Sequence, residues 1–157
     1  MNENHSLQPP LKDLYRDLIL DHARNPRHLG HVKDATHQCD GINPLCGDKL
    51  EIQLRVAEDD TIADGGFEGS GCAISIASAS LMTDTIIGRA VTDATALADS
   101  VTEGLENGFD AGTIPEMQRL RALEGVREFP SRVKCATLAW QTLRGALQGH
   151  TTPISTE

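Results

Sequence analysis

Apolar residues near the N-terminus of the chain recur every three or four residues, the spacing of one face of a helix. They are Leu11, Leu14, Tyr15, Leu18 and Ile19. This helix is expected to end near Ala23, because Asn25-Pro26 and Leu29-Gly30 are typical of a break in a helix. Residues 1–10 end in two prolines and are expected to form a disordered tail.

The next part of the chain alternates between apolar and polar residues, as a half-buried strand does. The alternation runs over 50–56, and a polar turn leads to a returning strand over 61–68, in which Gly65-Gly66 indicates a bulge or bend. A further strand is expected at about 35–42. Connections this short cannot be parallel crossovers, so the three segments predict an antiparallel meander.

From Cys72 onward the pattern is helical. One helix is expected to end at Gly88, and a second covers 92–106 with Thr92 as its N-cap. Thr113-Ile114-Pro115-Glu116 is a capping box that opens a short helix through Leu123. Phe129-Pro130 is expected to break the chain before a last helix that includes Leu138 and Leu147, and 149–157 should form a flexible tail. Strands followed by helices predict an α+β fold, a small three-stranded antiparallel sheet packed against several helices.

The composition narrows the class of protein. The 157 residues fit one domain, and 39% hydrophobic residues allow a hydrophobic core that needs no disulfide or metal ion to stabilise it. A net charge of −9 and only 3% aromatic residues argue against nucleic-acid binding. The N-terminus is not a signal peptide and no apolar stretch is long enough to span a membrane, which predicts a cytoplasmic protein. In that compartment, four cysteines are expected to be thiols or ligands rather than disulfides.

Two cysteines are expected at helix starts, where free N–H groups favour a thiolate. Cys72 follows Gly69-Ser70-Gly71, and Cys135 follows the cations Arg132 and Lys134. The plainer alternatives are a small cysteine closing a turn and a core cysteine. Cys39 is interpreted as structural or as a weakly reactive extra thiol. His22 is interpreted as a packing or capping residue, and the histidines show no helical metal motif.

The third candidate, Cys46, lies in a loop between Pro44 and Gly47, with Asp48 two residues further on. This Cys-x-Asp pair could bind one metal ion, although an aspartate after glycine more often caps a turn. Three thiols and a carboxylate would fill a tetrahedral site that suits zinc or an iron–sulfur species. No Cys-x-x-Cys pair is present, so such a site depends on the fold bringing the four residues together.

Taken together, the cysteines and the residues around them resemble the IscU/NifU N-terminal-domain family of iron–sulfur cluster assembly proteins, and within it the SufU branch. The resemblance covers about 11–148. Its matching stretches are Leu14-Tyr15-Arg16-Asp17 through Asp21-His22, Asn25-Pro26-Arg27, Asn43 to Asp48, Gly69 to Ser75 with Ala77-Ser78, and Arg132 to Trp140.

The resemblance implies the α+β sandwich of that family, and it implies that Cys46, Asp48, Cys72 and Cys135 are metal ligands. Three departures point away from a cluster scaffold. Lys134 stands where scaffold proteins carry histidine, and Glu128-Phe129-Pro130-Ser131-Arg132 stands where they carry a Leu-Pro-Pro-Val-Lys segment. In addition, about 104–125 looks like the insertion typical of SufU proteins.

By this resemblance, the chain is expected to be a zinc-dependent sulfurtransferase that accepts persulfide sulfur from a SufS-type cysteine desulfurase. It would pass the sulfur to a downstream iron–sulfur assembly complex. Cys46 is the expected acceptor, and Arg132 is a candidate for partner docking or persulfide stabilisation, or else an exposed helix-start charge. One alternative is an IscU-like scaffold that transiently binds a [2Fe–2S] cluster. Another is a purely structural zinc domain.

Overall fold

The computed structural model describes residues 11–109, 119–149 and 152–156. Its helices are α2 (Leu11–Arg24), α3 (Ala73–Ile86), α4 (Val91–Asn107), the 3-10 helix η1 (Arg121–Glu128) and α6 (Pro130–Leu147). Its strands are β1 (His37–Asn43), β2 (Asp48–Val56), β3 (Ile62–Ser70) and β4 (Ile154–Ser155). In the described part of the chain, no helix is long and apolar enough to cross a membrane.

The strands form one mixed sheet in the order β3-β2-β1-β4. The antiparallel meander of β1, β2 and β3 confirms the α+β prediction, but the predicted count of three strands is wrong, because β4 adds a parallel strand beside β1. The fourth strand lies within 149–157, where the sequence predicted a flexible tail. A strand of two residues, Ile154 and Ser155, is too short to show an alternating pattern.

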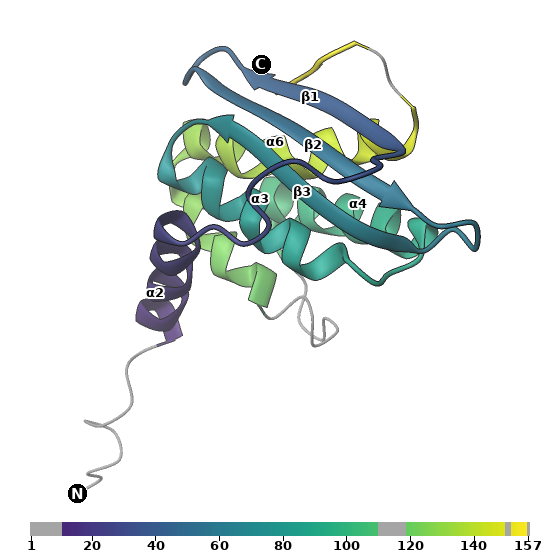
Figure 1. Ribbon diagram of the computed structural model, residues 1–157. Coiled ribbons are helices and arrows are strands. Elements are labelled where there is room, and N and C mark those ends of the chain that lie inside the picture. Colours follow the sequence, from purple (N-terminus) through teal and green to yellow (C-terminus); the bar gives the residue numbers. More distant parts are fainter. Residues whose placement is uncertain (1–10, 110–118, 150–151, 157) are drawn as a thin grey trace, which may run out of the picture.

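Helices cover one face of the sheet (Figure 1): α6 packs against β1 and β2, and α3 against β3. The alternating residues of β2 explain this arrangement. Leu50, Ile52 and Leu54 are at most 2% exposed and meet the helices, where Trp140 and Phe67 are also fully buried. Helix α6 approaches β1 closely because Gly41 has no side chain, and a Cβ there would collide with the side chain of Thr142.

The outer face of the sheet is partly covered by the segment that follows α2 (Figure 1). Gly30 N donates to Phe67 O at 2.8 Å, and Phe67 N donates to His28 O at 3.1 Å. Gly66 makes room for this segment, because a Cβ there would lie 2.8 Å from Gly30 O. The bulge expected at Gly65-Gly66 is therefore a mistaken interpretation. The register shift of β3 lies instead opposite Arg55 and Val56.

Two helix starts differ from the sequence prediction. The N-cap of α4 is Ala90, whose side chain makes no cap hydrogen bond, rather than Thr92. Helix α6 begins at Pro130, so Cys135 lies in its second turn and not at its start. The segment 121–128 is a 3-10 helix, and the capping box that begins at Thr113 lies outside the described residues.

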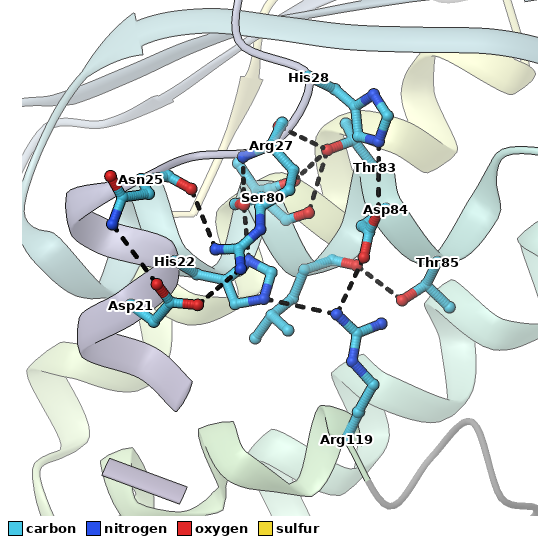
Figure 2. A network of polar contacts seen from close by, with 12 residues as sticks. Asp21, His22, Asn25, Arg27, His28, Ser80, Thr83, Asp84, Thr85 and Arg119 are labelled. Atoms are coloured by element: carbon cyan, nitrogen blue, oxygen red, sulfur yellow. Dashed lines mark hydrogen bonds and ion pairs between the residues drawn. The ribbon is translucent and has the colours of Figure 1, made fainter. Parts of the chain in front are cut away.

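A polar network fastens α2 and the segment after it to α3 (Figure 2). His22 Nδ1 lies 2.7 Å from Ser80 Oγ, and Arg27 N donates to the same hydroxyl at 2.8 Å. Arg119 donates to Asp84 at 3.0 Å and lies 3.4 Å from His22 Nε2. His22 is 1% exposed, which confirms its interpretation as a packing residue. The network holds α2 in place at one side of the candidate site.

Candidate metal centre

The loop between β1 and β2 brings two of the predicted ligands to one end of the sheet. Asn43 and Asp48 are the last paired residues of the hairpin, and the turn between them is closed by hydrogen bonds from Cys46 N and Gly47 N to Asn43 O, at 3.2 and 2.9 Å. Gly47 has a φ of +73°, which glycine adopts at little cost. This turn leaves Cys46 exposed at the tip and Asp48, 1% exposed, at its base.

The fold brings a third ligand to this hairpin from 87 residues away. One donor atom each of Cys46, Asp48 and Cys135 lie within 4.8 Å of one another. Cys135 is fully buried on α6, while Cys46 is exposed. The three residues therefore form a pocket of sulfur and oxygen donors with one accessible member.

Cys72 lies beside this group, although its sulfur is not among the donors that are all within 4.8 Å of one another. It is the N-cap of α3, where its sulfur accepts from Ser75 N at 3.5 Å, and its own N–H donates to Asp48 Oδ1 at 2.9 Å. Gly71 permits this contact, because a Cβ there would lie 2.6 Å from Asp48 Oδ1. The helix-start position predicted for Cys72 is thus confirmed.

Asn43 is a site residue to which the sequence pattern assigns no separate role. It is fully buried, and its amide Nδ2 donates to Asp48 Oδ2 at 3.4 Å and to Cys135 Sγ at 3.5 Å. Its own Oδ1 is buried without a hydrogen-bond partner. In the sequence, Asn43-Pro44 reads as an ordinary turn initiator, so no local signal distinguished it.

Burial has the largest effect on the protonation of Cys135. Burial, followed by hydrogen bonds with Asp48, Cys46 and Cys72, raises the pKa of the Cys135 thiol above its usual range. The Cys135 thiol is therefore neutral at pH 7 when no metal ion is bound. Metal binding there must displace a proton.

Arg132 places a positive charge beside the sulfur atoms of Cys72 and Cys135. The pKa of the Arg132 guanidinium is raised, first by charge interaction with Cys72 and then by hydrogen bonding and charge interaction with Cys135. Arg132 is exposed, so its positive charge is also open to a partner. Lys134, the other cation that the sequence placed beside Cys135, instead lines a separate cavity of about 510 Å³ with Arg127 and Glu106.

A groove of about 1110 Å³ begins at this site and runs between α2, η1 and the start of α6. Cys72 and Arg132 line one part of it, and Tyr15, Ile19 and Phe129 line other parts. Phe129 is 59% exposed. Cys39 takes no part: it is 4% exposed beside Gly145, and burial together with Asp40 raises the pKa of its thiol.

The donor set fits a soft or borderline metal ion. Cys46, Asp48 and Cys135 supply two sulfurs and an oxygen, and Cys72 is the adjacent candidate for a fourth ligand. Sulfur-rich sites of this kind suit zinc or iron–sulfur species rather than magnesium or calcium. The buried amide of Asn43 is the kind of outer partner that orients metal ligands.

Comparison with known proteins identifies the family. The model of the NifU-like N-terminal domain matches residues 14–153. The chain belongs to this family. It is 38% identical over 138 residues to the zinc-dependent sulfurtransferase SufU of Bacillus subtilis, a match that covers 88% of this chain and 92% of the relative. It is also 39% identical to the iron–sulfur cluster assembly scaffold protein IscU of Streptococcus pyogenes, covering 88% of this chain and 85% of that one.

A solved structure agrees with these relatives. The putative iron–sulfur cluster assembly scaffold protein for the SUF system from Fervidobacterium islandicum superposes with a TM-score of 0.76 at 32% identity, over 83% of this chain and 94% of that one. This protein is therefore a member of the iron–sulfur cluster assembly family that includes SufU and IscU. The relatives' names divide between a sulfurtransferase and a scaffold, so the specific activity has to be argued from the site.

Proposed function

We propose that this NifU-like domain is a zinc-dependent sulfurtransferase that accepts sulfur from a cysteine desulfurase for iron–sulfur cluster assembly. The supporting observation is the contrast between Cys46, exposed at a hairpin tip, and the buried Asp48 and Cys135 beside it. A purely structural site has no need of an exposed ligand. The 38% identity to a protein named zinc-dependent sulfurtransferase supports the same assignment.

In this proposal, Cys46, Asp48, Cys72 and Cys135 hold the zinc ion. Zinc would supply a Lewis acid that keeps the thiols deprotonated at neutral pH. Asn43 would orient Asp48 and Cys135 through its amide hydrogens. The partner is a SufS-type cysteine desulfurase, and the protein would work in the cytoplasm, where thiols stay reduced.

The transfer itself is a thiol–persulfide exchange at Cys46. The Cys46 thiolate attacks the outer sulfur of the desulfurase persulfide, a new sulfur–sulfur bond forms at Cys46, and the old one breaks to release the desulfurase thiolate. No net oxidation or reduction occurs. In a second exchange of the same kind, the Cys46 persulfide is the donor and passes its outer sulfur to the downstream assembly complex.

Arg132 is the residue that we propose assists this exchange. Its guanidinium is exposed and interacts with the sulfurs of Cys72 and Cys135. A cation there stabilises the negative charge that moves between sulfur atoms. We therefore expect Arg132→Ala to slow sulfur transfer while leaving the fold intact.

The test adds a SufS-type desulfurase and cysteine to the zinc-loaded protein and locates persulfide by mass spectrometry. We expect the extra sulfur on Cys46, and we expect Cys46→Ala to remain folded but to accept none. Cys39→Ala is the matched control, because Cys39 lies outside the site, and it should accept sulfur as the wild type does. Persulfide on none of the cysteines would reject the proposal.

The metal content separates this proposal from the scaffold alternative. A sulfurtransferase should be colourless as purified, with one zinc ion per chain. A brown protein whose labile cluster passes to an apo-acceptor would instead assign it the scaffold role. Unfolding of Cys46→Ala would favour a structural zinc site.

A further inference from the structure

A second group of metal-ligating side chains lies on the outer face of the sheet. One nitrogen of His31 and one carboxylate oxygen each of Glu51 and Glu68 lie within 4.8 Å of one another. We propose that these three residues bind a divalent first-row transition ion, independently of the cysteine site. The proposal rests on the placement of the three side chains, on the hydrogen bonds of Gln53 with His31 and Glu51 and on the negative charge of this face.

The strands place the two glutamates directly opposite each other. Glu51 of β2 pairs with Glu68 of β3, and Asp40 of β1 pairs with Glu51 on its other side. Since Leu50 and Ile52 point to the helices, Glu51 points to the outer face. Like charges directly opposite each other destabilise a sheet, and the chain carries a net charge of −9. A divalent cation bound between the two glutamates would offset the repulsion between their carboxylates.

His31 is brought to the glutamates by the segment that crosses the outer face (Figure 1). The backbone hydrogen bonds of Gly30 and His28 to Phe67 fix this segment against β3. His31 Nε2 consequently lies 3.3 Å from Glu68 Oε1. The set is thus a mixed imidazole and carboxylate site drawn from three separate segments of the chain.

Gln53 connects the members of this site. Its Oε1 accepts from Val32 N at 2.8 Å, which fixes the amide orientation, because a backbone N–H can only donate. Its Nε2 therefore faces Glu51 Oε1 at 2.6 Å and His31 Nδ1 at 3.1 Å. Gln53 is only 8% exposed although it lies on the outer face of the sheet. This buried amide holds the histidine and one glutamate before any ion arrives.

The same contacts define the change that a cation would cause. Since Gln53 donates to Nδ1, the neutral His31 ring carries its proton on Nε2, toward Glu68. A cation would take the place of that proton, the ring proton would move to Nδ1, and the hydrogen bond from Gln53 Nε2 to Nδ1 would be lost. Water can accept it there, because the His31 side chain is 72% exposed. Three protein ligands leave the remaining coordination positions to water.

Manganese is the most selective probe for this site. One imidazole and two carboxylates suit Mn²⁺, whereas the sulfur donors of Cys46 and Cys135 prefer softer ions. The experiment titrates Mn²⁺ into the zinc-loaded protein and follows paramagnetic broadening of amide resonances. We expect saturable broadening centred on His31, Glu51, Gln53 and Glu68. Broadening centred on Cys46, or spread evenly over the acidic surface, would overturn the proposal.

Paired variants make the test specific. Glu51→Gln keeps the shape of the side chain and removes one charged ligand, and we expect it to weaken Mn²⁺ binding by about tenfold or more. Glu58→Gln, in the exposed turn after β2, removes the same charge and should bind Mn²⁺ within about twofold of the wild type. His31→Ala should weaken binding in the same way as Glu51→Gln. Equal binding by Glu51→Gln and Glu58→Gln would show that net charge alone attracts the ion, and would reject the site.

Discussion

At the scale of single residues, Asn43 shows how a neutral side chain can organise a site of charged ones. Its amide donates to the carboxylate of Asp48 and to the sulfur of Cys135, which come from β2 and α6. The amide cannot turn around without setting its oxygen against the Asp48 carboxylate. Asn43 therefore links the hairpin to α6 at the point where the proposed ligands meet.

We expect Asn43→Ala to lower the zinc affinity by about 10–100-fold, because the ligands would lose the partner that orients them. The affinity is measured by competition with a chromogenic chelator. The matched control is Asn107→Ala, an exposed asparagine that donates to Glu103, and its affinity should equal that of the wild type. An unchanged affinity in a folded Asn43→Ala protein would show that Asp48 and Cys135 need no such support.

At the scale of elements, periodicity predicted the long helices and strands but missed features that depend on few residues. Helix α2, strands β2 and β3 and helix α3 each have enough residues to show a period, and they lie where predicted. Strand β4 has two residues and pairs only because α6 returns the chain to β1. The sequence pattern indicates a break at Phe129-Pro130, although proline is also favoured in the first turn of a helix, where Pro130 lies in α6.

The candidate site was also only partly predictable from the sequence. The residues around Cys46, Cys72 and Cys135 identified the candidate ligands through the family resemblance, whereas the spacing of the cysteines could not show that they converge. Asn43 and the group formed by His31, Glu51 and Glu68 could not be found from the sequence, because each depends on which strands are neighbours. Register is a property of the folded sheet and not of any one segment.

The packing of the outer segment on β3 leads to a prediction about Gly66. In Gly66→Ala, the new Cβ would lie 2.8 Å from Gly30 O and 3.1 Å from His28 O, both backbone atoms that cannot turn away. We expect a loss of about 1–3 kcal/mol in the free energy of unfolding, measured by urea denaturation. Gly125→Ala, where a Cβ meets nothing within 4 Å, should change that free energy much less. A stable Gly66→Ala protein would mean that the segment carrying His31 is not held tightly against β3.

At the scale of the whole molecule, we expect the attachment of α2 through the network in Figure 2 to depend on pH. Arg119 can only donate, so His22 Nε2 accepts from it, and the ring proton lies on Nδ1 and points to Ser80 Oγ. Protonation of Nε2 would place an N–H against a guanidinium. Burial, and then the charges of Arg27 and Arg119, accordingly lower the pKa of His22 below its usual 6.5, although Asp21 and Asp84 act in the opposite direction.

The sign of the pH effect follows from this shift. Just below pH 6.5, the unfolded chain binds a proton at His22 that the folded protein does not, so the free energy of unfolding falls as the pH falls. Asp21 and Asp84 act at lower pH. A hydrogen bond from Arg27 lowers the pKa of Asp21. Burial alone would raise the pKa of Asp84, but hydrogen bonds from Arg119 and His28 lower it. The stability that these two carboxylates contribute is therefore lost only below pH 3.8. The loss of stability between pH 6.5 and 5 should therefore come largely from His22.

We expect urea denaturation at several pH values between 5 and 8 to show this loss in the wild type, and a flatter profile in His22→Asn. Asparagine does not titrate, and its amide can reach Ser80 as Nδ1 does. His37→Asn is the matched control, since among the described hydrogen bonds the His37 side chain contacts only the neighbouring Thr36 hydroxyl, and its profile should follow that of the wild type. If His22→Asn loses as much stability on acidification as the wild type, the pH dependence arises elsewhere. In that case the network attaches α2 to α3 through contacts that do not depend on the charge of His22.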